Sequence, residues 1–175
     1  MNRILKPLLT IFLLFLLTGC TSNKNPIKDE NIDKVINNII YSYSNENLSK
    51  SSGYIEFVNQ SNIIFSEYLS KNALDILAEN RIVSIYYSTV NGLDVPNPSD
   101  IIGLDIKKSK EYERNNYIGY EYKISYKLKS KSETIDMVDY MSFKVEKDGD
   151  NLIDELYVLE NSSIFEIYNT RLKDS

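Results

Sequence analysis

The residue types that carry most enzyme chemistry are scarce in this sequence. Among 175 residues there is no histidine and one cysteine, Cys20. Nucleophilic catalysis by a serine or cysteine paired with a histidine is therefore excluded, and zinc sites lose their two usual ligands. Any acid–base chemistry would fall to aspartate, glutamate, lysine or tyrosine. We expect no catalytic residue, metal site or cofactor, although an enzyme built on carboxylates and tyrosines remains open.

One carboxylate falls on the apolar face of a predicted strand. Met137, Met141, Phe143 and Val145 alternate with polar residues, and Asp139 is in phase with them. Such a residue is either a catalytic base inside a cavity or a point where a β-bulge turns the side chain out. We expect a bulge that exposes the carboxylate to solvent.

Tyrosine is the one compositional excess, with 14 in the chain. Tyr120, Tyr122 and Tyr126 share one face of a predicted strand, where they are candidates to line a cavity with rings whose hydroxyls orient a ligand. The alternative, which we favour, is that they fill the core beneath a helix and direct their hydroxyls to its rim.

Two other clusters of charged residues have simpler interpretations. Asp148, Asp150 and Asp154 suggest calcium, but Leu152 and the early Gly149 break the EF-hand spacing, so a hairpin turn is favoured. A second cluster contains seven lysines and predicts a solvated outer sheet face, with a docking surface for an acidic partner or anionic polymer as the alternative. These lysines are Lys107, Lys108, Lys110, Lys123, Lys127, Lys129 and Lys131.

Helical periodicity dominates the first half of the chain that carries these residues. A stripe at helical spacing predicts a helix from Asp29: Ile32, Val35, Ile36, Ile39, Ile40 and Tyr43. Residues 54–69 suit either a short strand followed by a helix or two short helices. A further helix begins near Lys71, and Asn91-Gly92 with Pro96-Asn-Pro98 marks a loop.

Beyond Ile101 the period changes to that of strands. Residues 101–113, 119–129, 137–145 and 152–159 predict about four consecutive antiparallel strands, with a hairpin at residues 147–151. Residues 161–175 form either a short helix or a tail. Helices first and a meander second predict one α+β domain over residues 29–160, with the N-terminal helices packed on a curved antiparallel sheet.

The first twenty residues have the pattern of an export signal. Arg3 and Lys6 precede the apolar run Leu8–Leu17, which is too short to span a bilayer as a helix. Leu17-Thr18-Gly19-Cys20 then resembles the lipobox of bacterial lipoproteins. The resemblance implies cleavage between Gly19 and Cys20 and attachment of lipid to the Cys20 thiol. Residues 20–28 would then be a lipidated cysteine and a polar tether.

Charge limits the partners of the mature chain. Removal of residues 1–19 takes away Arg3 and Lys6 and no acidic residue, which leaves 18 Lys+Arg against 25 Asp+Glu, a formal charge of −7. Nucleic acid and anionic headgroups would be repelled on average. The richness in Asn, Ile, Lys and Tyr is typical of a low-GC Gram-positive source, where the lipid would hold the domain on the outer face of the cell membrane.

The order of predicted elements is similar to that of the NTF2-like (cystatin-like) superfamily, in which a curved sheet wraps a long N-terminal helix into a cone. The resemblance covers residues 29–160 and is one of pattern. Together with the lipobox, it implies a membrane-anchored extracytoplasmic lipoprotein that acts as a non-enzymatic binding or interaction module, with another envelope protein as its possible partner. The alternative is a small-molecule binder or isomerase-like enzyme that uses the cone cavity.

Overall fold

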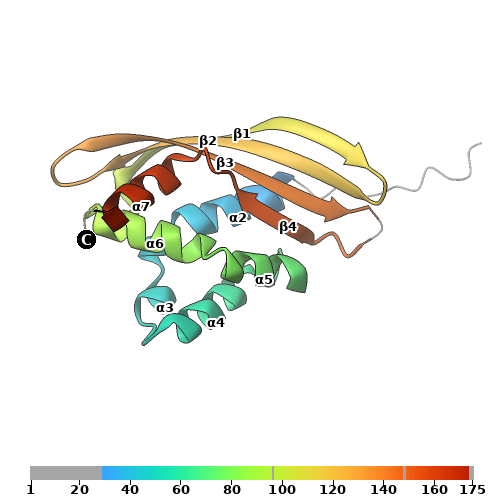
Figure 1. Cartoon of the computed structure of the whole chain (residues 1–175), viewed down its shortest axis with the longest axis horizontal. Coiled ribbons are helices and arrows are strands. Elements are labelled where there is room, and N and C mark those ends of the chain that lie inside the picture. Colours follow the sequence, from blue (N-terminus) through green and yellow to red (C-terminus); the bar gives the residue numbers. More distant parts are fainter. Residues whose placement is uncertain (1–28, 96, 148, 174–175) are drawn as a thin grey trace, which may run out of the picture.

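Helices cover one face of a four-stranded antiparallel sheet in the computed structural model, shown in Figure 1. The structure describes residues 29–95, 97–147 and 149–173. Two layers of helices lie below the sheet in this view: α2, α6 and α7 next to it, and α3 and α4 beyond them. The α+β class and the packing of helices on about four strands, both predicted from sequence, are confirmed.

Six α-helices and two 3₁₀ helices lie in the described ranges. The helices are α2 (Asp29–Ile40), η1 (Ser42–Ser44), α3 (Glu46–Ser49), α4 (Tyr54–Phe65), α5 (Lys71–Glu79), α6 (Ile82–Gly92), η2 (Pro98–Asp100) and α7 (Ser163–Lys173). Their starts follow local chemistry. The Asn45 side chain accepts from the amides of Asn47 and Leu48 to begin α3, and the Ser70 side chain accepts from Ala73 N to begin α5.

The sheet is a meander with strand order β1-β2-β3-β4. The strands are β1 (Ile101–Arg114), β2 (Tyr117–Lys129), β3 (Thr134–Glu146) and β4 (Ile153–Val158). β2 and β3 pair without interruption from Tyr117↔Glu146 to Lys129↔Thr134. β1 pairs with β2 through two register shifts, at 102–105 and 108–110. The predicted hairpin after Glu146 is confirmed by the antiparallel β3–β4 pair.

The core lies between the inner face of the sheet and α2. Ile32, Val35, Ile36, Ile39 and Ile40 are at most 1% exposed, as their helical spacing predicts. Burying side chains of this size stabilises the fold by roughly 1.5–3 kcal/mol each. This helix therefore contributes one complete apolar stripe to the core.

Two segments resolve alternatives that the sequence left open, and a third had no predicted structure. Residues 54–65 form the single helix α4, which is neither the strand with a helix nor the two short helices expected. The half-buried Phe57 and the buried Ser61 and Phe65, four residues apart, form its inward stripe. The β-branched and aromatic segment that follows Arg81 is also helical, as α6. Residues 163–173 form helix α7 rather than a tail.

The end of the described chain completes the edge of β3 beyond β4. Leu159 N donates to Tyr140 O at 2.8 Å, after which the chain turns into α7. The Ser162 and Ser163 hydroxyls accept from Tyr140 N at 2.9 Å and from Val138 N at 3.0 Å. Two backbone donors that β4 leaves unpaired are thereby satisfied by side chains.

Candidate functional site

Asp139 is fully buried beneath the sheet, at 0% exposure. Its Oδ2 accepts from the hydroxyls of Tyr126 at 2.7 Å and Tyr86 at 2.9 Å, and its Oδ1 accepts from Ile164 N at 3.0 Å. The predicted bulge that turns Asp139 to solvent is therefore wrong. The residue pairs in register with Ile124, so the regular alternation of β3 directs its carboxylate into the core.

The three donors to Asp139 come from three elements that are distant in sequence. Tyr86 lies on α6, Tyr126 on β2 and Ile164 at the start of α7. The carboxylate thus joins β3 to two helices and a neighbouring strand. Its place at the first turn of α7 also sets its negative charge near the positive end of that helix.

The electrostatics of this network follow from burial. Desolvation raises the pKa of Asp139 above its usual value, while hydrogen bonds from Ile164, Tyr126 and Tyr86 act in the opposite direction. Burial and the neighbouring carboxylate raise the pKa values of Tyr86 and Tyr126 well above their ordinary value. Both oxygens of the carboxylate already accept protein donors, so the arrangement suits support of the fold rather than proton transfer to a substrate.

The three candidate tyrosines of β2 are buried on its inner face. Tyr120, Tyr122 and Tyr126 are each at most 3% exposed. The Tyr122 ring meets Phe143 edge to face, with ring centroids 5.8 Å apart. Its hydroxyl donates to Asp29 Oδ1 at 2.8 Å. Tyr126 donates to Asp139, so the hydroxyls of both Tyr122 and Tyr126 are held by carboxylates.

A small cluster of charges fixes the start of α2 to the sheet. Lys108 donates to Asp29 at 3.2 Å and to Glu111 at 2.9 Å, and its ammonium lies 5.3 Å from the centre of the Tyr120 ring. The hydrogen bond from Tyr122 has the largest effect on the pKa of Asp29 and lowers it; burial acts in the opposite direction, and the contacts with Lys108 lower the pKa further. The first described residue is therefore held against β1 and β2.

The exposed apolar side chains of α4 form the most distinctive surface in the described ranges. Ile55 is 79% exposed, Ile63 67% and Tyr54 49%. Glu56 and Asn59 are exposed on the same helix. The outer side of α4 therefore combines three exposed apolar side chains with polar ones.

A shallow hollow of about 400 Å³ lies beside this surface, open to solvent. Tyr54, Ile55, Val58 and Asn59 of α4 line one side, and Ala78, Glu79 and Arg81 line the other. The Arg81 guanidinium lies 5.6 Å from the centre of the Tyr54 ring, and the Tyr54 hydroxyl donates to Ala78 O at 3.0 Å. Arg81 has φ 53°, in the left-handed region that non-glycine residues rarely adopt. The backbone is thus strained where α5 turns into α6.

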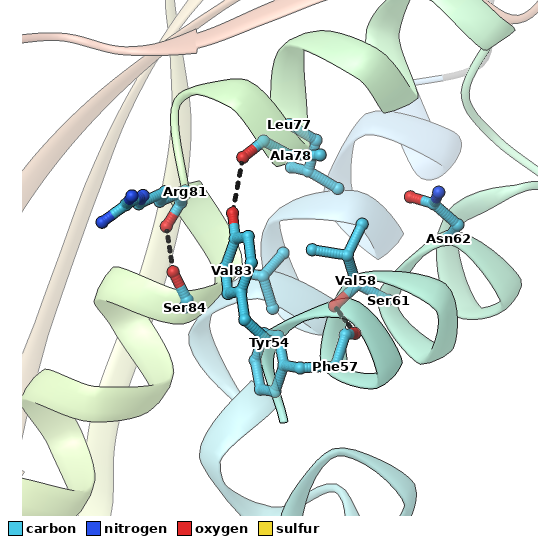
Figure 2. A pocket seen from close by; sticks show the side chains of 10 residues that line it. All are labelled: Tyr54, Phe57, Val58, Ser61, Asn62, Leu77, Ala78, Arg81, Val83 and Ser84. Atoms are coloured by element: carbon cyan, nitrogen blue, oxygen red, sulfur yellow. Dashed lines mark hydrogen bonds between the residues drawn. The ribbon is translucent and has the colours of Figure 1, made fainter. Parts of the chain in front are cut away.

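Figure 2 shows the space beneath this hollow, where α4, α5 and α6 meet. The enclosed volume is about 10 Å³. That is about the volume needed for one water molecule. Asn62 Oδ1 is buried on this lining without a protein partner, so a single water would satisfy it.

The seven lysines of the predicted cluster do not all lie on one face of the sheet. Lys107, Lys110, Lys123, Lys127 and Lys129 lie on the outer face, whereas Lys108 pairs in register with the buried Tyr122. Lys131 lies in the β2–β3 turn and forms an ion pair with Asp94 at 2.7 Å. The predicted outer sheet face is therefore present, with ion pairs such as Lys110–Glu121 at 3.1 Å and Lys127–Asp136 at 3.0 Å.

The described part of the acidic hairpin shows no sign of a cation site, and the N-terminal motif lies outside the described residues. Asp154 accepts from Ser70 Oγ at 2.9 Å, and no group of three or more candidate metal ligands occurs within residues 29–95, 97–147 and 149–173. Asp148 lies outside the described residues, as do the predicted signal, Gly19, Cys20 and the tether. Within the described ranges, no helix is both long and apolar enough to cross a membrane.

Comparison with known proteins gives no relative from which a role can be transferred: no family model, curated protein or solved structure matches the chain. The structure alone therefore establishes the fold class. The function rests on the Asp139 network and on the exposed side of α4. Sequence reasoning missed the exposed surface of α4, because an apolar cluster does not by itself say which side faces the core. It also missed the donors to Asp139, which lie far along the chain.

Proposed function

We propose that this chain is a lipid-anchored extracytoplasmic protein that acts as a non-enzymatic binding module of the cell envelope, and that α4 is the surface that contacts its protein partner. The exposure of Ile55, Ile63 and Tyr54 on one helix carries the proposal. Exposed apolar side chains gathered on one element are typical of protein-interaction sites. The anchor is supported by the lipobox Leu17-Thr18-Gly19-Cys20.

The chemistry of the hollow indicates the kind of partner. Its lining is mostly apolar, with one cation, Arg81, and one carboxylate, Glu79. An apolar side chain from the partner would fill the hollow and cover Ile55, while the guanidinium on the Tyr54 ring offers a donor at the rim. Aromatic residues and arginine are the groups that most often anchor such contacts.

Burial of Asp139 favours this function over the isomerase-like alternative. A general base has to reach the proton that it abstracts. Asp139 is 0% exposed and bonded to three protein donors, and in the described part of the chain neither Asp139 nor Tyr120, Tyr122 and Tyr126 lines the hollows of about 10, 90 and 400 Å³. A ligand site built on these residues would require the core to open.

Site-specific photo-crosslinking in intact cells tests the proposal. A benzoylphenylalanine at position 55 or 63 should give one defined crosslinked envelope protein, and the same group at Leu172 on α7, another exposed apolar position at 58% exposure, should not. Ile55→Asp should abolish recovery of that partner from detergent-solubilised membranes, whereas Leu172→Asp should not reduce it. Mass spectrometry of the same samples reports acylation of Cys20. Equal crosslinking from positions 55 and 172 would remove α4 as the contact surface.

A further inference from the structure

The outer face of β1 and β2 is strongly cationic in a chain that is acidic overall. The side chains that alternate with the buried ones place six cations on this face: Lys107, Lys110, Arg114, Lys123, Lys127 and Lys129. The same face of these two strands carries two carboxylates, Asp105 and Glu121, so its net charge is +4. The chain from residue 20 has a net charge of −7. The charge is therefore distributed unevenly: the chain as a whole repels anionic surfaces, but this face is cationic.

The arrangement of these lysines is unfavourable without an anionic partner. Lys107 and Lys123 are directly opposite each other in the β1–β2 register, and like charges at opposed positions destabilise a sheet. Lys107 forms an ion pair with Asp105 at 2.6 Å, which offsets its repulsion by Lys123. In the part of the chain that the structure describes, Lys123 and Lys129 have no carboxylate within ion-pair distance. Their ammonium groups are thus available to anions.

The point where the predicted tether reaches the fold lies at the same level of the sheet. Asp29 is bound by Lys108 and Tyr122, which are paired with each other and adjoin the opposed Lys107 and Lys123 along their strands. From Cys20 to Asp29 the chain extends at most about 30 Å. Asp29 lies on the inner face, beside the middle of β1 and β2, and a lipid on Cys20 therefore keeps these two strands within reach of the membrane surface.

We propose that the β1–β2 outer face docks on the anionic phospholipid headgroups of the bilayer that holds the Cys20 anchor. This rests on the proposed lipid attachment. The length and end point of the tether, together with charge complementarity, single out the bilayer among anionic partners. The exposed Ile102, paired with Lys127 on the same face, adds an apolar side chain for the headgroup region.

Docking in this way would leave the partner surface accessible. Figure 1 shows α3 and α4 on the side of the molecule opposite to the sheet, with α2 and α6 between them. With the sheet on the membrane, the apolar side chains of α4 would point away from the bilayer toward other envelope proteins.

Fluorescence quenching in vesicles tests the orientation. The acylated full-length product is reconstituted in phosphatidylglycerol–phosphatidylcholine vesicles that contain a nitroxide-headgroup lipid. Because the Cys20 thiol is occupied by lipid, Ser125→Cys on the outer face and Asn59→Cys on α4 each provide one free thiol for the dye. Each lysine that reaches an anionic surface favours the docked orientation by about fivefold. We expect at least about fivefold stronger quenching at position 125 than at position 59.

Control experiments test which interactions cause the difference in quenching between positions 125 and 59. The difference should fall by more than half with Lys123→Ala and Lys129→Ala together, in phosphatidylcholine alone, or at 1 M salt, where the screening length is about 3 Å. The pair Lys34→Ala and Lys50→Ala, on the helical side, should leave it unchanged. Equal quenching at both positions in acylated protein would overturn the docking and leave the α4 proposal intact. A chain without acyl groups on Cys20 would overturn both.

Discussion

Replacing Asp139 should be the most damaging single change among the buried polar residues, because one carboxylate serves three donors. Asp139→Ala leaves the hydroxyls of Tyr86 and Tyr126 and the amide of Ile164 without acceptors. An unsatisfied buried group costs about 1–3 kcal/mol. Removing a desolvated charge offsets part of that sum. We expect the free energy of unfolding to fall by about 4 kcal/mol.

Conservative variants separate hydrogen bonding from shape. Asp139→Asn keeps the size of the side chain, but its NH₂ group either faces the Ile164 amide or replaces the acceptor of the two hydroxyls, whose protons then have no acceptor, so the expected loss is about 2 kcal/mol. Tyr126→Phe removes one of three bonds and should cost about 1 kcal/mol. Asp136→Ala, three residues away on the exposed face of β3, breaks a surface ion pair with Lys127 and should cost less than about 1 kcal/mol.

The assay is urea unfolding of residues 20–175 with Cys20→Ala, followed by circular dichroism. With a slope of about 2 kcal/mol per M, Asp139→Ala should lower the midpoint by about 2 M.

The pH dependence of stability supplies a second measurement. Because the folded pKa of Asp139 is raised, its contribution to stability is fully present below the unfolded pKa of 3.8 and is lost as pH rises through the folded value. The stability difference between the wild type and Asp139→Asn should therefore decrease over that interval. Equal midpoints for Asp139→Ala and Asp136→Ala would refute the network as a support of the core.

Three further predictions use positions where the backbone or a single contact decides the outcome. Gly53→Ser should stabilise the fold by roughly a few tenths of a kcal/mol, because Gly53 begins α4 without a capping side chain and has open space around it; an unchanged melting temperature would contradict this. Gly103→Ala should destabilise by about 1 kcal/mol through its φ of 65° alone, since nothing lies within 4 Å of the added methyl group, and a neutral result in urea unfolding would exclude backbone strain at the β1 irregularity. Tyr122→Phe should raise the pKa of Asp29 toward its ordinary value. Because a lowered folded pKa stabilises above the unfolded pKa and that stability is lost as pH falls, this variant should also flatten the acid limb of stability; an unshifted ¹³C titration of Asp29 would show that the hydrogen bond is not the main cause.

Sequence periodicity was sufficient to predict a helix or strand wherever one face of the element is buried and the other is exposed to solvent. The stripe from Ile32 to Ile40 predicted α2, and the alternation from Tyr120 to Leu128 predicted β2, because each pattern reports a single boundary between core and solvent. α4 lacks such a boundary. Its apolar residues lie on both the core side and the solvent side, so the pattern suits a strand as readily as a helix.

Asp139 shows a different limit. Its phase on β3 was visible in the sequence, and that phase alone placed it in the core. The expectation of a bulge rested on the cost of burying a carboxylate without partners. The partners are Tyr86, 53 residues away, and Ile164, 25 residues away, which sequence spacing does not bring together. Long-range pairing of polar groups was therefore the missing information.

The irregular edge of β1 would affect how copies of the domain pair with one another when many are held in one plane. Lipid anchoring would concentrate the domain in two dimensions, where exposed strand edges of neighbouring copies meet in matching orientation and invite edge-to-edge growth. The two register shifts and the left-handed Gly103 interrupt the row of free backbone groups on β1. At the opposite edge, Ser70 N and Tyr68 O bond to Ile153 of β4. Neither edge therefore offers a long straight template for another strand, which would limit edge-to-edge pairing of anchored copies at high surface density.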